Sequence, residues 1–372
     1  MAVFLILFSL AGNGSVWMTS ETGIYRPIIQ DEVVVSNKGT LFIVQRRNAQ
    51  VLVYDAKGSF LKTIGNRGQG PGEFALPTWI HYLDGHIYVE DANQNRVSCF
   101  TEDGKFVSAQ VLPQNNLQIR KVTGGWLVGD WESSDDASKP VSITLFDEDF
   151  KNPFIIASWP RPEENSSNSV QSDGTQIPKV PINPAVDEPR IVASKDGNFG
   201  FLVRQKTANV EVIDIAKRKF LTTLNNSATP IPFNDEWGEK MVKNLSDAIT
   251  GGEIGFPIKF IPDLPKYFPL VRELRINPNG DLNVVFWTGI PEKHHEVRVY
   301  DSKLTPKEPS FAPEVLERWF GEHQGIAYLS VFDAEEEEAS IAGVPLKNVA
   351  DFIRKNPIHF DGLPGNAVIN LD

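Results

Sequence analysis

A repeat with one fixed offset constrains the fold of this chain more than any other feature. Gly39, Tyr54, Gly58 and Phe60 each have a counterpart, glycine or aromatic, 46 residues later. A tight turn followed by an apolar run begins again at Gly125, Gly197, Gly280 and Gly325. Periods of about 40 to 50 residues with short alternating strands are typical of propeller blades. We therefore expect an all-β chain built from successive blades.

The number of repeat units predicts a six-bladed β-propeller of four-stranded antiparallel blades, with residues 15–372 as one domain. Five blades are clear, and the sixth needs a strand from one end of the chain. Residues 16–19 and residues 367–370 are both candidates for this strand. Closing the ring removes exposed sheet edges, which is the physical reason to recruit a distant chain end.

Two steps of the repeat are longer than one blade and indicate insertions at residues 160–189 and 225–265. The first insertion is rich in Pro, Ser and Asn and lacks both helical and strand periodicity, so we expect a long mobile loop. The second predicts a short helix between blades four and five, with Asn234 as N-cap and an apolar stripe that ends near Ile249.

The charge and cysteine content exclude some classes of protein. The chain has 36 Lys and Arg against 48 Asp and Glu, a net charge of −12, and no basic cluster of the kind that binds nucleic acid. Its single cysteine, Cys99, excludes an intrachain disulfide. Cys99 lies in an alternating run without a neighbouring histidine, which favours a buried thiol over a nucleophile.

The first residues of the chain are apolar. Residues 1–12 carry no charge, and polarity rises at Asn13. This stretch is too short to span a bilayer as a helix, but it has the length of a signal-peptide core. We therefore expect residues 1–14 to be a truncated signal segment and the protein to be extracytoplasmic, periplasmic, surface-bound or secreted. A buried first strand is the alternative.

Several motifs carry a family resemblance. The residues from Gly68 to Phe74 read GQGPGEF, and they are followed by Pro77, by IYVED ending at Asp91, and by the pair Asn95 and Arg96. This pattern resembles the NHL-type repeat of six-bladed propellers. The segment LPKYFP at residues 264–269 is similar to a later blade of the bacterial exported six-bladed propellers. The resemblance implies a six-bladed ring, often outside the cytoplasm, and no single activity.

Strand order within a blade assigns every connection to one of two faces. Turns between the first and second strands, and between the third and fourth, must share a face, and here they are tight turns such as Asp84-Gly85 and Asp103-Gly104. The other face receives residues 65–76, both insertions and residues 130–139, 288–295 and 333–338. Binding residues tend to lie on such loops above a rigid scaffold. We therefore expect ligands to bind at this second face.

The candidate binding residues stand where second strands end or where connections leave them: Arg46, Arg67, Glu90, Asp91, Asp130, Trp131, Arg204 and Trp287. Cations and aromatic rings would suit an anionic or sugar-like ligand. The carboxylates could hold calcium, although such an Asp more often caps the following turn.

Other motifs have simpler explanations. The glycine-rich residues 65–72 lack the Lys-Ser or Lys-Thr of a phosphate loop and precede a strand, so we interpret them as a blade connection. The six histidines do not show the spacing of metal ligands: His81, His86, His294, His295, His323 and His359. The resemblance is also compatible with two kinds of propeller enzyme, the zinc-using amidating lyases and the calcium-using lactonases. The metal ligands that these enzymes need are not evident in the sequence.

These observations predict a monomeric binding module for a small molecule, glycan or protein, without a cofactor, a transmembrane span or a nucleic-acid partner. The alternative is a metal-assisted hydrolase or lyase that uses Glu90, Asp91 and Asp130 at the channel mouth. A purely architectural role in a cell-envelope assembly is a third hypothesis.

Overall fold

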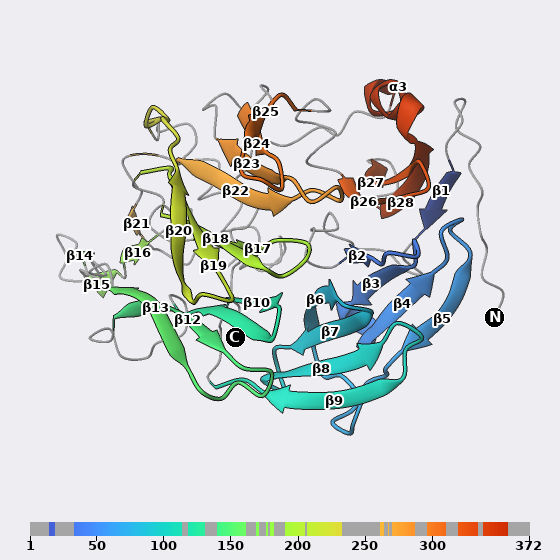
Figure 1. The fold of residues 1–372 in the computed structure, drawn as a ribbon. Coiled ribbons are helices and arrows are strands. Elements are labelled where there is room, and N and C mark those ends of the chain that lie inside the picture. Colours follow the sequence, from blue (N-terminus) through green and yellow to red (C-terminus); the bar gives the residue numbers. More distant parts are fainter. Residues whose placement is uncertain are drawn as a thin grey trace.

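Six four-stranded antiparallel sheets form the protein in the computed structural model (Figure 1). The structure describes residues 15–18, 33–113, 118–130, 140–160, 169–170, 176–177, 179–181, 190–204, 207–232, 261–263, 267, 270–286, 296–309, 319–333 and 338–355. The six sheets are the blades of a β-propeller, which confirms the predicted fold class.

Each blade is a meander whose strands follow one another in sequence. Blade 1 contains β2 (Val33–Val35), β3 (Leu41–Gln45), β4 (Gln50–Tyr54) and β5 (Phe60–Ile64). Blade 2 contains β6 (Pro77–Leu83), β7 (His86–Asp91), β8 (Arg96–Thr101) and β9 (Phe106–Val111). Blade 3 contains β10 (Gln118–Val122), β11 (Gly125–Gly129), β12 (Val141–Phe146) and β13 (Phe154–Trp159). Blade 4 contains β17 (Arg190–Ala193), β18 (Phe199–Val203), β19 (Val210–Asp214) and β20 (Lys219–Leu224). Blade 5 contains β22 (Val271–Ile276), β23 (Leu282–Phe286), β24 (Glu296–Tyr300) and β25 (Pro306–Lys307).

Blade 6 closes the ring with a strand from the other end of the chain. Its inner three strands are β26 (Trp319–His323), β27 (Ile326–Asp333) and β28 (Glu338–Pro345), and its outer strand is β1 (Ser15–Met18). β1 runs antiparallel to β28, with Val16 opposite Ala342. Of the two predicted closing strands, the N-terminal one is therefore used, and residues 367–370 lie outside the described residues. In Figure 1 the blue β1 stands beside the red blade 6.

The first strands of the blades surround the centre of the ring. β2 contacts β6 and β26, β10 contacts β6 and β17, and β17 contacts β22. The second and third strands carry the core, because apolar side chains on both faces of each sheet pack against the neighbouring blades. Between blades 1 and 2, for example, Phe42, Val51, Phe74 and Phe100 form one buried cluster. Burial on both faces explains the near-continuous apolar run of β3, in which every residue is buried.

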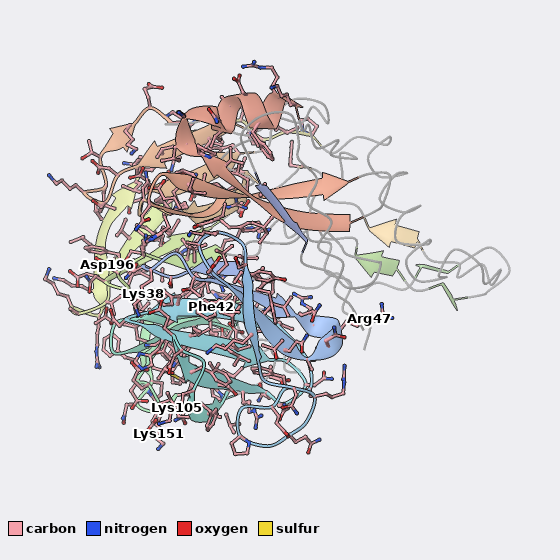
Figure 2. All side chains as sticks on the ribbon, turned by 90° about the vertical axis from the view of Figure 1, so that its right-hand side faces the viewer. Lys38, Phe42, Arg47, Lys105, Lys151 and Asp196 are labelled. Atoms are coloured by element: carbon pink, nitrogen blue, oxygen red, sulfur yellow. The ribbon has the colours of Figure 1, made fainter. Side chains whose placement is uncertain are left out.

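The two faces of the ring differ as strand order predicts. Figure 2 places the turn residues Lys38, Lys105, Lys151 and Asp196 on one side and Arg47, between the second and third strands of blade 1, on the other. We call the first side the turn face and the second the loop face. The strand ends that the longest connections join all lie at the loop face.

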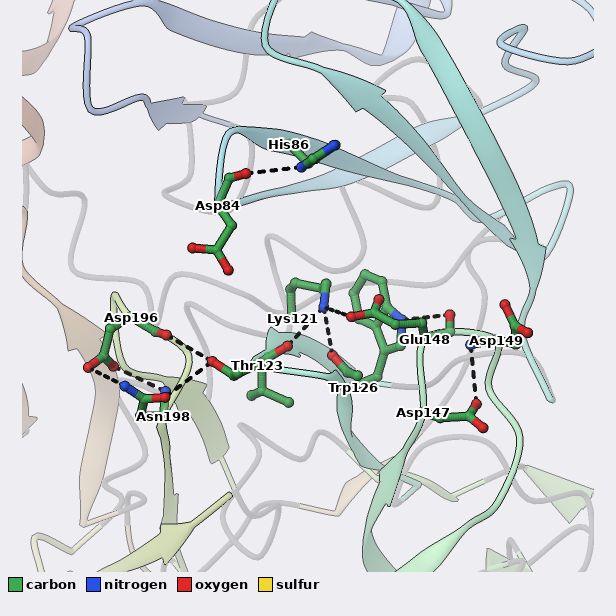
Figure 3. Close-up of polar contacts among 12 residues, drawn as sticks. Asp84, His86, Lys121, Thr123, Trp126, Asp147, Glu148, Asp149, Asp196 and Asn198 are labelled. Carbon is green, nitrogen blue, oxygen red and sulfur yellow. Dashed lines mark hydrogen bonds and ion pairs between the residues drawn. The ribbon is translucent and has the colours of Figure 1, made fainter. Parts of the chain in front are cut away.

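Hydrogen bonds on the turn face link one blade to the next. In blade 3, Thr123 donates its backbone N–H to the Gly197 carbonyl of blade 4, over 3.0 Å. Its hydroxyl lies 3.1 Å from the Asp196 carbonyl and 3.2 Å from Asn198 Oδ1 (Figure 3). Side chains of the short turns are thus used to join blades.

Short strands within the two insertions pair with each other. β14 (Ser169–Val170) pairs with β15 (Gln176–Ile177), and β16 (Lys179–Pro181) runs parallel to β21 (Ile261–Asp263). The first insertion thus contains short strands that the sequence patterns did not predict, since β-pairs of two or three residues are too short to produce a periodic pattern. The pairing of β16 with β21 joins the two insertions. The helix predicted from Asn234 to Ile249 lies outside the described residues.

One α-helix occurs in the described residues, and the sequence patterns did not predict it. The 3-10 turn η3 (Leu346–Asn348) follows β28 and leads into α3 (Val349–Lys355). Val349 and Phe352 of this helix are buried in the apolar cluster shared by blades 5 and 6. A second 3-10 turn, η2 (Arg46–Asn48), connects β3 to β4 at the loop face.

Candidate functional site

A side chain of blade 1 reaches the inner strand of blade 2 at the loop face. Arg46 begins η2, directly after the second strand of blade 1. Its Nη2 donates a hydrogen bond of 3.4 Å to the Thr78 carbonyl, and its guanidinium carbon lies 5.5 Å from the centre of the Trp79 ring. A guanidinium over an indole face is a favourable cation–π arrangement. Arg46 and Trp79 therefore form one contact at the start of an inner strand.

An imidazole–carboxylate pair lies next to Trp79. Glu90 is opposite Trp79 in the register of β6 and β7, and its Oε1 lies 2.5 Å from His81 Nε2. The Glu90 side chain is 6% exposed and that of His81 is 12% exposed. The His81 ring also meets the Trp126 ring edge-on, at 6.0 Å between centroids. The pair is thus almost enclosed where blades 2 and 3 meet.

Asp91 organises the glycine-rich connection. This carboxylate is fully buried and accepts backbone N–H bonds from Ala75 at 2.6 Å and from Leu76 at 3.1 Å. On the other side it accepts the backbone N–H of Gln94 at 3.1 Å and its side-chain amide at 2.7 Å. Asp91 therefore caps the turn after β7 and fixes the loop before β6.

Arg67 projects from the same connection and is exposed. Its Nη2 donates to the Arg47 carbonyl over 2.7 Å, and its Nη1 donates to the Ala75 carbonyl over 3.5 Å. The backbone of the loop does not form a phosphate cradle, because the Glu73 carboxylate accepts the Gly70 N–H at 2.8 Å. Residues 65–76 connect β5 to β6, as the sequence predicted.

The remaining predicted residues lie elsewhere or outside the described residues. Asp130 follows β11 and accepts the Ser142 backbone N–H and, at 2.8 Å, the Ser142 hydroxyl. Arg204 pairs with Glu211 at 3.0 Å and lies 4.7 Å from the centre of the Trp159 ring, which belongs to the outer strand of blade 3. Trp131 and Trp287 lie outside the described residues.

The structure thus brings together only part of the predicted set. Arg46 lies over the Trp79 ring, and Glu90 is opposite Trp79 in the register of β6 and β7. The contacts of Arg204 lead instead to an outer strand. Within the described part of the chain, no group of three or more His, Cys, Asp and Glu side chains is arranged to hold a metal ion.

Trp79 and His81 belong to this site, although the sequence patterns did not single them out. A signal for His81 was present, because the two-residue turn Asp84-Gly85 places residues 81 and 88 opposite each other, so that Glu90 falls diagonally beside His81 on the same face. Trp79 was harder to place, since the pairing shifts between Pro77 and Trp79. We call Arg46, Trp79, His81 and Glu90 the blade 2 site.

Comparisons with known proteins agree with this architecture. A family model described as a 6-bladed beta-propeller matches residues 28–120. No curated protein matches the sequence. None of the helices in the described residues is long and apolar enough to cross a membrane.

Solved structures resemble the chain over most of its length. A member of the duf4221 family from Bacteroides vulgatus has a TM-score of 0.51 and 11% identity, over 90% of this chain and 96% of that one. A protein from Bacteroides fragilis that is classed as exported has a TM-score of 0.47 and 16% identity, over 89% of this chain and 94% of that one. At such identities the likeness concerns the fold alone. The chain is a six-bladed β-propeller of four-stranded antiparallel blades, closed by its N-terminal strand.

Proposed function

We propose that the protein is a binding propeller that recognises a small molecule, glycan or protein ligand at its loop face. The observation that carries this proposal is the contrast between the two faces. On the turn face, short turns bond to one another across blades, as Thr123 does with Asp196 and Asn198. The loop face receives the longest connections. The blade 2 site lies at this face, near the start of the inner strand β6. Ligand sites of propellers and barrels are commonly built from connections above a rigid scaffold.

The chemistry of the blade 2 site favours a ligand with an anionic or hydroxyl-rich group. Arg46 supplies a cation and Trp79 a half-buried aromatic surface, beside the pair of His81 and Glu90, which bond to each other. Arginine binds oxyanions through its planar fork of donors, and indole rings pack well on sugar rings. The apolar residues 1–12 support an extracytoplasmic location for this activity.

A ligand screen followed by substitution tests the proposal. Thermal-shift screening against sugars, acidic sugars and organic acids identifies a ligand, and its Kd is then measured by calorimetry. Arg46→Ala and Trp79→Ala should each weaken binding about tenfold, because each removes part of the contact surface worth about 1.4 kcal/mol. Arg218→Ala is a matched control, since Arg218 lies 5.6 Å from the centre of the Phe154 ring on the turn side.

Two results contradict the proposal. One is a ligand whose affinity falls on Arg218→Ala and stays unchanged in both blade 2 site variants. The other is protection from proteolysis or exchange confined to the turn face when the ligand is added. Either result would move recognition away from the loop face.

The structure supports metal-assisted hydrolysis less well. The oxygens of Asp91 and Asp130 accept hydrogen bonds from backbone and side-chain donors, and Glu90 pairs with His81. A carboxylate engaged in this way loses those bonds when it takes a metal ion. Metal analysis of the purified protein distinguishes the hypotheses, because stoichiometric calcium or zinc with a matching thermal shift would favour the enzyme.

A further inference from the structure

Two connections of blade 1 bring three arginines together at the loop face. Arg46 and Arg47 lie in η2, and Arg67 comes from the loop between β5 and β6. Arg67 bridges the two connections, because its Nη2 donates to the backbone carbonyl of Arg47 over 2.7 Å. We call the exposed surface of Arg47 and Arg67 the arginine patch. It stands out in a chain whose net charge is −12.

The Arg67 guanidinium is held in place by neutral groups. Besides the Arg47 carbonyl, its described partner is the Ala75 carbonyl, over 3.5 Å. Four other arginines pair with carboxylates: Arg204 with Glu211, Arg275 with Glu273, Arg298 with Glu296 and Arg354 with Asp351. Arg96, like Arg67, donates to backbone carbonyls. A carbonyl fixes the orientation of a guanidinium but leaves its full positive charge in place.

Backbone hydrogen bonds and one buried side chain hold the loop that carries Arg67. The Gly68 N–H bonds to the Phe74 carbonyl at 3.0 Å, and the Phe74 N–H bonds to the Asn66 carbonyl at 2.9 Å, which brackets Arg67. Phe74 is fully buried and anchors the loop in the core. Ordering flexible side chains is a major cost of binding, so a cation that is already immobilised binds its partner more tightly.

The acidic side chain of the same loop bonds to the loop itself. Glu73 is its one acidic residue, and the carboxylate accepts N–H groups from Gly70 at 2.8 Å and from Asn66 at 3.3 Å. The bond from the Gly70 N–H, with the Asn66 amide, holds the pKa of Glu73 below its usual value. The loop therefore satisfies its own anion internally and does not use Arg67 to do so.

From this arrangement we infer that the arginine patch binds an oxyanion group of a ligand, a carboxylate, phosphate or sulfate, with Arg67 as the principal contact. The inference rests on the proposed function, because it names a chemical group that a loop-face ligand would carry. Arg67 has five N–H donors and uses two in the bonds to Arg47 and Ala75. The remaining donors can form the paired bonds that guanidinium groups make with oxyanions.

Titration of simple oxyanions tests the inference without the natural ligand. Sulfate, phosphate and citrate are added to the full chain, with sodium chloride at equal ionic strength as reference, and thermal unfolding and calorimetry are recorded. At least one oxyanion should raise the midpoint of unfolding beyond chloride and bind with one dominant site. Comparison of sulfate and phosphate with citrate shows whether tetrahedral anions or carboxylates bind best. Equal responses to chloride and to all three oxyanions overturn the inference, because screening alone then explains them.

Substitutions locate the site. Arg67→Ala should abolish the oxyanion response or weaken it at least tenfold, whereas Arg67→Lys should retain the charge and part of the affinity. Arg47→Ala removes a second cation but preserves the backbone carbonyl that holds Arg67, so it should weaken binding without loosening the loop. Arg218→Ala on the turn side should leave the response unchanged. An oxyanion response that survives both Arg67→Ala and Arg47→Ala overturns the inference.

The two proposals fail in different ways. If a screened ligand depends on Arg46 and Trp79 but not on Arg67, the oxyanion inference is wrong and the loop face remains the binding face. If oxyanions bind through Arg67 while the screened ligand protects the turn face, the proposed function is wrong and the arginine patch remains.

Discussion

Gly39 and Gly85 show why the repeat can be recognised in the sequence. They have φ angles of +81° and +74°, which only glycine adopts without strain, and they close the turns between the first and second strands of blades 1 and 2. A Cβ at Gly39 would also lie 2.5 Å from the His323 ring of blade 6. The same backbone requirement recurs in the other blades, where Gly124, Gly197, Gly280 and Gly325 also have positive φ.

Individual site residues were harder to predict, because their roles depend on contacts between blades. Arg46 was predicted from its place after a second strand, but its partner Trp79 belongs to another blade. Arg204 occupies the same place in blade 4 and turns toward Trp159 on an outer strand. Equivalent sequence positions thus have different surroundings, which a pattern within one chain segment does not encode.

Cys99 gives a test at the scale of one residue. The thiol is buried, and burial raises its pKa above the usual value. Because the thiolate is the reactive form, the folded protein should react slowly with a thiol reagent at pH 8, and denaturant should make the reaction fast and stoichiometric. Rapid stoichiometric labelling of the folded protein would contradict a buried thiol at this position.

At the scale of elements, the regular strands followed from the sequence and the irregular segments did not. Short, mostly apolar strands bounded by turn signals could be predicted, as for β3 and β11. α3 was missed because a helix of seven residues offers only two turns of periodicity. The pairing of β16 with β21 joins segments about eighty residues apart, and nothing local in either segment specifies its partner.

A buried lysine, Lys121, links blade 3 to blade 2. Lys121 Nζ donates to the carbonyls of Val122 at 2.8 Å and Gly125 at 3.1 Å, and pairs with Glu148 at 2.9 Å (Figure 3). It also lies 5.1 Å from the centre of the Tyr88 ring of blade 2. The lysine side chain is 3% exposed, whereas that of Glu148 is 54% exposed.

Removing Lys121 should therefore cost more stability than removing Glu148. Lys121→Ala removes a buried donor from the carbonyls of Val122 and Gly125 and should lower the free energy of unfolding by on the order of 1–3 kcal/mol. Glu148→Ala removes a solvent-exposed partner and should cost about 1 kcal/mol or less. Urea unfolding of both variants measures the difference. Equal losses would mean that Lys121 acts chiefly through its ion pair.

For the whole molecule, the sequence predicted a closed ring and left open which chain end closes it. Either end could supply a short apolar strand, and the choice depends on how β28 pairs in three dimensions. The structure pairs β28 with β1. Four residues at the start of the chain thus pair with residues 340–343 of β28 and complete the last blade.

Truncation tests ring closure. Deleting residues 1–19 should lower the midpoint of thermal unfolding by several degrees and promote self-association, because the edge of β28 becomes available for pairing. Deleting residues 367–372, the other predicted closing segment, is the matched control and should leave the midpoint nearly unchanged. The opposite ranking would show that the C-terminal segment closes the ring.

Hydrogen–deuterium exchange of the protein with and without a screened ligand tests whether recognition occurs at the loop face. Ligand should slow exchange in residues 46–49, 65–76 and 92–95, which connect strands at the loop face. Exchange in the turns at residues 55–59, 84–85 and 102–105 should not change. Protection confined to those turns, with none at residues 46–49 and 65–76, would mean that the ligand binds at the turn face instead.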